Sequence, residues 1–387
     1  MIPYGKQEIT QQDIDAVVDV LKSDYLTQGP QVPRFEQAIK IATNADYALA
    51  VNSATSALHI ACLALGVQKG DVVWTTPITF VASANCALYC GADIDFVDID
   101  PNTYNLSASK LKSKLENAKI NNLPLPKVVI PVHLCGQPCE METIHALGNE
   151  YGFKIIEDAS HAIGGKYKDK PIGNCEYSDV TVFSFHPVKI ITTAEGGVAT
   201  TNCSELAQKM DLFRSHGVTR DKELMTEESH GGWYYQQVEL GYNYRMTEMQ
   251  AALGVSQMTR LHDFVAKRNE LASNYDALLK DFSVVIPHQI PESYSARHLY
   301  VIRLKLDEIN LSHNQVFEQL RENGVGVNLH YIPVHTQPYY QSLGFSQGLF
   351  SESEKYYEEA ISIPLFHAMT QEEQKEVVLV LSKILQG

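Results

Sequence analysis

Apolar and polar positions alternate in short blocks over the first half of the chain. Residues 1–45 are expected to hold one amphipathic helix, at about 11–22, followed by a break at 25–30. The buried strands expected after it are 47–51, 72–76, 94–97, 127–132 and 154–156, and the helices between them are 55–65, 80–89, 109–117 and 141–151. This alternation predicts an α/β fold with a mostly parallel central sheet covered by helices on both faces. Ligands of such sheets bind beyond the carboxyl ends of the strands.

The pattern changes in the second half of the chain. A helix is expected at 206–213, then a long polar segment rich in Gly, His and Tyr, then one long helix at 247–279. The elements expected after these are a strand at 299–306 and helices at 315–322, at 352–360 and from 371 onward. We therefore predict two domains, a large α/β domain over 1–246 and a smaller α+β domain over 247–387.

Charge and hydropathy exclude two classes of partner. The chain has 387 residues, with 46 acidic and 31 basic side chains and a formal net charge of −15. Because no basic stripe or Lys/Arg block offsets this charge, nucleic acid is not expected as a partner. Apolar runs are too short to span a bilayer, and the N-terminal residues lack the layout of a signal peptide. We expect a cytoplasmic protein without membrane association.

The cysteines do not indicate a disulfide framework or a metal site. There are seven, scattered along the chain, and an odd count does not fit complete pairing. Cys135 and Cys139, with His133 nearby, could suggest a metal, but a second pair of ligands at zinc spacing is missing. Buried, reduced thiols are the preferred interpretation, and no metal is predicted.

A single lysine stands between two further apolar strands, expected at 180–185 and 197–201. Lys189 lies in the polar loop that ends at Glu195-Gly196-Gly197. Such a position is useful if the amine has to reach one point in a partly desolvated pocket. Desolvation lowers the pKa of an amine, and the neutral amine is the form that attacks a carbonyl to give a Schiff base. An ordinary loop lysine is the alternative.

Two other strand-end loops carry groups suited to a flat, phosphorylated ligand. In the loop after the first strand, the N–H groups of Ala54 and Thr55 would point outward at a helix start, where the helix dipole favours an anion; a plain N-cap is the alternative. Asp158 follows another strand, where it could hold a protonated heterocyclic nitrogen or simply cap the next turn. Ser184 could join the phosphate site, and Phe80 could stack on a flat ring or pack in the core. Together these groups are what pyridoxal 5′-phosphate (PLP) requires.

Eight stretches of sequence carry a resemblance to a known family. They are YLTQGP (25–30), NSATSALH (52–59), TTPITFVASAN (75–85), VDIDPNTYN (97–105), EDASHAIG (157–164), SFHPVKIITTAEGG (184–197), FRSHG (213–217) and GYNYRMTEMQAALG (241–254). With them the chain resembles the DegT/StrS-type sugar aminotransferases, a branch of the fold-type I PLP enzymes, over nearly its whole length. SATSAL and TTAEGG are most similar to the transaminases of pseudaminic acid synthesis. Many relatives have Gly in place of Ala54 or Ala194, and often Gln in place of His161.

The resemblance implies a role for each matching residue. Lys189 would bind the cofactor as a Schiff base and then move a proton between the donor and sugar carbons. Asp158 would pair with the pyridinium nitrogen, Phe80 would stack on the ring, and His161 would lie near its phenolic oxygen. The residues implied at the phosphate are Ala54, Thr55, Ser184 and, from the partner subunit of a homodimer with shared active sites, Asn243. The residues implied at the sugar-nucleotide site are Tyr4, Tyr25, Leu26, Thr27, His330 and Tyr331.

The reaction implied is transfer of an amino group from L-glutamate to the C4 keto group of a UDP-linked 4-keto-6-deoxy-N-acetylamino sugar. A dTDP-linked or 3-keto substrate is an alternative that the residues leave open. A PLP-dependent sugar dehydratase is disfavoured, because those enzymes replace the lysine with histidine and Lys189 is present. A non-catalytic PLP-binding sensor is disfavoured because the chain offers neither spare length for a DNA-binding module nor a basic patch.

Overall fold

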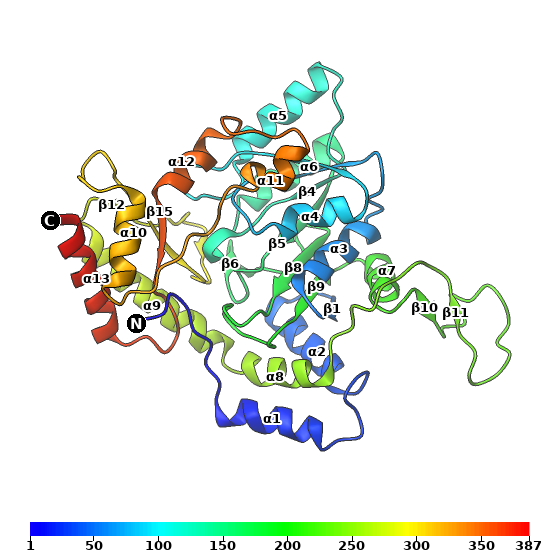
Figure 1. Cartoon of the computed structure of the whole chain (residues 1–387). Coiled ribbons are helices and arrows are strands. Elements are labelled where there is room, and N and C mark those ends of the chain that lie inside the picture. Colours follow the sequence, from blue (N-terminus) through cyan, green and yellow to red (C-terminus); the bar gives the residue numbers. More distant parts are fainter. Residues whose placement is uncertain (387) are drawn as a thin grey trace.

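A seven-stranded sheet forms the centre of the computed structural model, which describes residues 1–386 (Figure 1). Its strands, in spatial order, are β1 (Tyr47–Val51), β9 (Gly197–Thr201), β8 (Val180–Ser184), β5 (Lys154–Asp158), β4 (Val128–Ile130), β2 (Val72–Thr75) and β3 (Asp93–Phe96). Only β9 runs against its neighbours β1 and β8, while the pairings from β8 through to β3 are parallel. The predicted mostly parallel sheet is thus confirmed.

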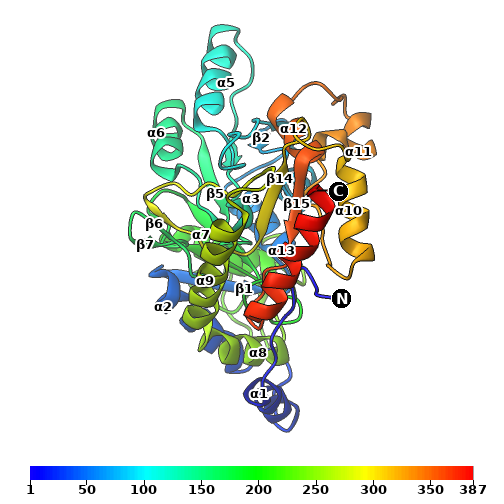
Figure 2. The ribbon, with the colours of Figure 1, turned by 90° about the vertical axis from the view of Figure 1, so that its left-hand side faces the viewer.

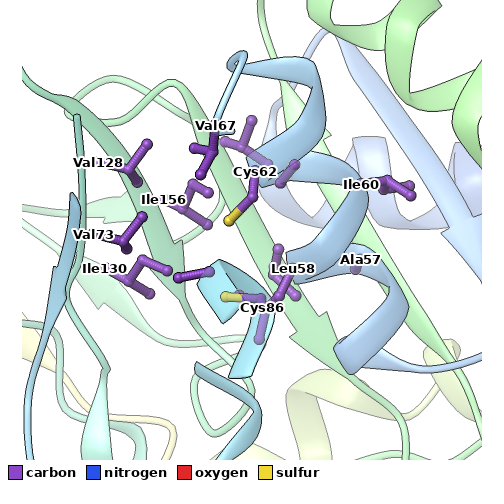
Figure 3. Packing of buried hydrophobic residues seen from close by; sticks show 14 of the residues in the cluster. Ala57, Leu58, Ile60, Cys62, Val67, Val73, Cys86, Val128, Ile130 and Ile156 are labelled. Carbon is purple, nitrogen blue, oxygen red and sulfur yellow. The ribbon is translucent and has the colours of Figure 1, made fainter. Parts of the chain in front are cut away.

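Helices cover both faces of this sheet, as the sequence predicts. On one face lie α3 (Ala54–Ala64), α4 (Ala82–Tyr89) and α7 (Ser204–Arg214). On the other lie α2 (Gln31–Thr43), α5 (Ala108–Ile120), α6 (Met141–Tyr151), α8 (Glu248–Met258) and the start of α9 (Leu261–Leu279). Figure 3 shows the hydrophobic core between the sheet and the helices of the first face, in which Leu58 and Cys62 of α3 point at strand residues such as Ile156. Because both faces are buried, the strands consist almost wholly of buried residues.

The N-terminal 45 residues contain two helices, so the expectation of one is wrong. The first, α1 (Gln11–Leu21), agrees with the prediction, and Thr10 caps it by accepting a hydrogen bond from the backbone N–H of Asp13. The second, α2, has no capping side chain at its N-cap residue Pro30; the Glu248 carboxylate accepts from Gln31 N–H (2.6 Å) and Val32 N–H (3.2 Å) instead, so the local start signal is missing. Its buried residues Phe35, Ile39 and Thr43 recur every four positions, and this spacing was the available clue.

The single long helix expected at 247–279 is two helices. α8 ends at Met258, α9 begins at Leu261, and the Arg260 between them has non-helical dihedral angles. Arg260 forms ion pairs with Glu8 (3.1 Å) and Asp13 (2.5 Å), and α8 packs against α1 and α2. Tertiary contacts with the N-terminal segment therefore occur at the break, which the local helical pattern does not indicate.

The C-terminal part has its own small sheet and core. The sheet is antiparallel, in the order β12 (Val284–Val285), β14 (Tyr300–Leu304) and β15 (Ala360–Ile363). Helices α10 (His313–Glu322) and α13 (Gln371–Gln386) lie beside it (Figure 2), and the second half of α9 packs in the same core. Short elements η2 (Val334–Thr336), α11 (Pro338–Ser342) and α12 (Ser351–Glu359) connect them. An α+β arrangement is present here, and the boundary at 246/247 stays a prediction.

Three smaller features complete the described chain. In a short three-stranded sheet, β6 (Lys166–Tyr167) pairs with both β13 (Ser293–Tyr294) and β7 (Lys170–Pro171), and η1 (Leu134–Gly136) follows β4. The strands β10 (Val218–Thr219) and β11 (Gln236–Gln237) form an arm that projects from the body (Figure 1). Trp233 and Leu240 on this arm are 75% and 71% exposed. No helix within residues 1–386 is long and apolar enough to cross a membrane.

Candidate active site

A cavity of about 470 Å³ lies at the carboxyl ends of β5 and β8, against the first turn of α3. Seven of the eight residues predicted to contact the cofactor line it: Ala54, Thr55, Phe80, Asp158, His161, Ser184 and Lys189. His330 and Tyr331, predicted at the sugar-nucleotide site, line it as well. The structure therefore brings these strand-end residues together at one edge of the sheet, as the parallel arrangement requires.

Lys189 is half-buried in the loop that leaves β8. Its backbone N–H donates to the carbonyl of His186 (2.9 Å), and Thr193 N–H returns to the carbonyl of Phe185 (3.0 Å). Burial lowers the pKa of the Lys189 amine to about 8, although the charge of Asp158 acts in the opposite direction. An appreciable share of the amine is therefore neutral near physiological pH, which is the reactive form.

Close backbone packing fixes this loop against α3. A Cβ atom added to Gly197 would lie 2.5 Å from the backbone N of Ala54, so only glycine allows β9 to start there. Ala194 adopts φ +67°, a conformation costly for residues with a Cβ. The Thr192 hydroxyl accepts a hydrogen bond from its N–H (2.9 Å). The loop thus carries strain next to the lysine.

The first turn of α3 has the form of an anion-binding site. Ser53 is the N-cap, and its Oγ accepts a hydrogen bond from Ser56 N–H (3.1 Å). The N–H groups of Ala54 and Thr55 have no hydrogen-bond acceptor among residues 1–386, and both residues line the cavity. Ser184 reaches the same cavity from the end of β8. The cap and the free donors coexist, so the two interpretations of this loop do not exclude each other.

Asp158, the last residue of β5, is 5% exposed and accepts two hydrogen bonds. Ser160 N–H donates to Oδ1 (3.1 Å), which is the capping contact considered as an alternative, and the Ser83 hydroxyl donates to Oδ2 (2.6 Å). Ser83 is in turn 2.8 Å from the hydroxyl of Thr79. The carboxylate is therefore held in one orientation while it borders the cavity.

The neighbouring Glu157 forms hydrogen bonds within the protein interior and does not line the cavity. Its carboxylate lies 2.7 Å from His133 Nε2 and accepts hydrogen bonds from Ser178 (2.5 Å) and Thr181 (3.2 Å). Burial alone would raise the pKa of Glu157, but the hydrogen bonds from His133 and the two hydroxyls outweigh it and lower the pKa. Adjacent strand residues face opposite sides, which separates the two carboxylates.

His161 is buried against the cavity and is neutral. Burial lowers the pKa of its imidazole well below the ordinary value, and Lys189 and His330 act in the same direction. Nδ1 accepts a hydrogen bond from Cys135 N–H (3.3 Å), so the proton is assigned to Nε2, which lies 3.2 Å from the Tyr331 hydroxyl. The Nε2–H group of His161 is thereby directed toward Tyr331 at the mouth of the cavity.

Aromatic rings surround the mouth of the cavity. Phe80 is 58% exposed and lies two residues before α4, so it precedes that helix and does not begin it as expected. Its ring centroid is 6.2 Å from that of Tyr331, and the ring of Tyr4 is 5.5 Å from His330. Burial, followed by the charge of Lys189, lowers the pKa of His330 to about 4. An exposed phenylalanine beside buried polar groups offers a face for a flat ligand.

Five predicted site residues do not line this cavity, and one of them, Tyr4, adjoins it through its ring contact with His330. Tyr25, Leu26 and Thr27 are exposed in the loop before α2, where Thr27 pairs with Thr247. Asn243 is also exposed, and its backbone carbonyl is 3.5 Å from Asn52 Nδ2, close to the N-cap of α3.

Sequence reasoning missed several residues that line the cavity. Among them, Thr79 and Ser83 support Asp158, and the backbone N–H of Ser160 donates to its carboxylate. His186 and Glu195 stand at the rim with 4.0 Å between their side chains. The signal for Thr79 and Ser83 was their spacing of four residues around a helix start, which places both hydroxyls on one side.

The cysteines and potential metal ligands give no second site. All seven cysteines are free; Cys203 is exposed, and Cys90 and Cys135 are only partly buried, so uniform burial of the thiols was wrong. His133 receives Cys139 N–H on Nδ1 (3.2 Å) in addition to its contact with Glu157. Within residues 1–386, no group of three His, Cys, Asp or Glu side chains is arranged to hold a metal ion.

The fold and the cavity define a class of protein: an α/β protein whose sheet edge combines a desolvated lysine, a buried carboxylate and a helix N-terminus for an anion. Residues 7–382 match the DegT/DnrJ/EryC1/StrS aminotransferase family. The chain belongs to this family.

Two relatives with named activities match the chain over its whole length. It is 38% identical over 387 residues to the UDP-4-amino-4,6-dideoxy-N-acetyl-beta-L-altrosamine transaminase of Campylobacter jejuni, covering 100% of this chain and 98% of the relative. Helicobacter pylori PseC, an aminotransferase involved in the biosynthesis of pseudoaminic acid, superposes with a TM-score of 0.90 at 32% identity, covering 100% and 99%. Spr1654 of Streptococcus pneumoniae, solved in a PLP-form, gives a TM-score of 0.88 at 28% identity, covering 100% and 98%.

Proposed function

We propose that the protein is a PLP-dependent aminotransferase that moves an amino group from L-glutamate to the C4 keto group of a UDP-linked 4-keto-6-deoxy-N-acetylamino sugar. The observation that carries this proposal is the joint placement of Lys189, with its pKa lowered to about 8, and the buried Asp158 in one cavity. The Campylobacter and Helicobacter relatives support the choice of substrate.

The residues of the cavity fit PLP. The free N–H groups of Ala54 and Thr55, with the hydroxyl of Ser184, would hold the phosphate at the start of α3. Asp158 would pair with the ring nitrogen, and Phe80 would cover one face of the ring. When bound, the pyridine ring supplies an electron sink for negative charge on the substrate carbon next to nitrogen.

Lys189 and His161 would carry out the proton handling and the orientation in this site. Lys189 would hold the cofactor through its amine and later hold or release a proton at Nζ, for which a pKa of about 8 is well matched. His161 would donate through Nε2 toward the phenolic side of the ring, because its Nδ1 already accepts from Cys135. Both roles require neutral or readily neutralised nitrogen atoms, and burial provides this condition.

The sugar nucleotide would enter at the aromatic mouth. Tyr4, His330 and Tyr331 lie together there in one chain, since the Tyr4 and His330 rings are 5.5 Å apart and the His330 and Tyr331 rings 5.0 Å apart. Their polar tips can bind sugar hydroxyls while the rings pack on the sugar face. Glutamate would use the same mouth in the other half of the reaction.

We infer that the remaining residues act across a homodimer. Tyr25, Leu26, Thr27 and Asn243 are exposed and lie outside the cavity of their own chain, so they are free to reach a second copy. The exposed Trp233 and Leu240 on the neighbouring arm add apolar surface that a partner would cover. A two-fold axis would place each such surface over the other cavity. Cytoplasmic location remains a prediction from the sequence.

A panel of nucleotide keto-sugars tests the function directly. Purified holoprotein should convert UDP-linked 4-keto-6-deoxy-N-acetylamino sugar to the amino sugar with L-glutamate, and glutamate alone should change the absorption spectrum of the cofactor. The panel should include dTDP-linked and 3-keto sugars, which represent the alternative substrates. Activity on 2-keto acids with none of the nucleotide sugars would refute the proposal, and a spectrum that glutamate leaves unchanged would favour a sensor.

A further inference from the structure

Two hydroxyl groups form consecutive hydrogen bonds that lead to the carboxylate of Asp158. Thr79 Oγ1 is 2.8 Å from Ser83 Oγ, and Ser83 Oγ is 2.6 Å from Asp158 Oδ2. Thr79 is 2% exposed, Ser83 0% and Asp158 5%. All three residues border the cavity but are almost fully buried, so the two hydroxyl groups support the carboxylate from within the protein.

The number of available protons determines which group donates in each of these two hydrogen bonds. An ionised carboxylate only accepts, so Ser83 donates its single hydroxyl proton to Asp158. The oxygen of Ser83 is then an acceptor, and Thr79 donates to it. Hydrogen bonds aligned in this way polarise each other and strengthen the bond to the charged end.

The same turn also carries the aromatic face of the cavity. Ser83 N–H donates to the carbonyl of Phe80 (3.2 Å), so Phe80 and Ser83 belong to one turn at the start of α4. Phe80 lies between the two hydroxyl residues in sequence and is exposed at the mouth. The turn at the start of α4 thus fixes both the ring of Phe80, in the loop before the helix, and the carboxylate of Asp158, at the end of β5.

We propose that Ser83, supported by Thr79, is a positioning residue that holds Asp158 for the ring nitrogen of the cofactor. With Ser160 N–H on Oδ1 and Ser83 on Oδ2, the carboxylate cannot rotate, and its remaining acceptor positions are left for the ring. Ser83 itself does not contact the reacting atoms. This inference rests on the proposed function, because it requires a heterocyclic nitrogen in front of Asp158.

The test measures cofactor affinity as well as turnover. The Kd of PLP for stripped wild-type protein and for Ser83→Ala would be measured by absorption titration, and kcat and KM on the reconstituted enzymes. A hydrogen bond to a charged group is typically worth roughly 10-fold or more, so Ser83→Ala should raise Kd and lower kcat by about 10-fold each. KM for the sugar nucleotide should change less than about 3-fold, because the Ser83 hydroxyl is fully buried and already bonded to Asp158 and Thr79.

A second serine offers a matched control. Ser353 Oγ donates to Asp98 Oδ1 at 2.6 Å, and Ser353 is also 0% exposed, but neither residue lines the cavity. Ser353→Ala removes a buried serine–aspartate bond of the same length. It should lower Tm by a similar amount as Ser83→Ala while leaving the Kd of PLP within about 2-fold of wild type.

Thr79 keeps the inference testable if Ser83→Ala fails to fold. Thr79→Val preserves the shape and removes the donor to Ser83, and a loss of about 3-fold in cofactor affinity is expected; Thr79→Ser retains the hydroxyl and should restore wild-type affinity. Equal Kd values for wild type, Ser83→Ala and Thr79→Val, with Asp158→Asn impaired, would overturn the inference and leave the proposed function standing. A wild-type protein that neither binds PLP nor transaminates would overturn the proposed function first, and this inference with it.

Discussion

The cavity edge and the outer surface beside it differ in how complete they are within one chain. At the cavity edge, Lys189, Asp158 and the first turn of α3 converge, and hydrogen bonds within the chain fix the carboxylate and the helix cap. On the outer surface, Asn243 and the loop 25–27 are exposed and reach no cavity of their own. In the proposed dimer, a second copy would cover this outer surface, and its Asn243 would complete the phosphate site of the cavity.

Removal of the lysine should have the largest effect. Lys189→Ala should lower turnover by about 10³-fold or more, because the amine is the group that would hold the cofactor and carry the proton. The fold should persist, since the lowered pKa of Lys189 shows that burial opposes its charge.

Lys114→Ala is the control for this change. Burial also lowers the pKa of Lys114, but its amine is paired with Asp95 (2.6 Å) away from the cavity. It should retain wild-type kcat. Near wild-type transamination by purified Lys189→Ala would contradict the assignment.

The two adjacent carboxylates should separate into different effects. Asp158→Asn should lower kcat by about 10²–10³-fold, because a neutral amide stabilises the protonated ring nitrogen poorly. Glu157→Gln should instead lower the free energy of unfolding by about 1–3 kcal/mol, since it disturbs buried bonds to His133, Ser178 and Thr181, with kcat nearly unchanged. Kinetics and thermal unfolding of both variants, with cofactor occupancy checked, measure this contrast. Less than a tenfold loss in Asp158→Asn would leave it only a capping role.

The pH dependence of Lys189 should be visible without turnover. With a pKa of about 8, against 10.5 for an ordinary lysine, its neutral fraction rises steeply up to pH 8 and then levels off. Competitive labelling of cofactor-stripped protein with an amine-reactive reagent should therefore modify Lys189 tens of times faster at pH 7 than typical exposed lysines. Peptide mass spectrometry measures the rates, and a Lys189 profile that still rises above pH 9.5 would exclude the lowered pKa.

The smallest expected effect tests the outer surface. Lys189→Ala mixed with an impaired Asn243→Asp should regain roughly a quarter of wild-type activity, because random reassortment makes about half of the dimers hybrid and each hybrid has one intact site. If Asn243 serves its own subunit, every site carries a lesion and mixing restores nothing. Subunit exchange, followed by mass spectrometry of the mixture, is the necessary control.

Much of the fold could be predicted because the local pattern agrees with the tertiary structure. The strands around Asp158 and Lys189 are apolar and short, and their helices carry matching apolar stripes. The errors occur where contacts distant in sequence decide. Helix α2 is capped not by its own N-cap residue but by the distant Glu248 carboxylate, and the break between α8 and α9 lies at Arg260, whose partners Glu8 and Asp13 are far away in sequence.

The site shows the same division. Lys189, Asp158, Ala54 and Thr55 could be proposed because strand ends of a parallel sheet share one edge. Thr79 and Ser83 were missed, since hydroxyl groups in a turn are common and only packing against β5 directs them at Asp158. Their function depends on an orientation that residue spacing alone does not specify.

The sequence by itself determined the alternating strands and helices of the central sheet, the residues at its strand ends and the family resemblance, because periodicity and motifs are local properties of the chain. Tertiary structure decided the rest. Burial of Lys189 lowers its pKa, the hydroxyl pair orients Asp158, and Asn243 lies outside its own cavity. Each of these depends on which surfaces lose water and which donors meet across long sequence separations, and that is settled only when the sheet and its helices pack.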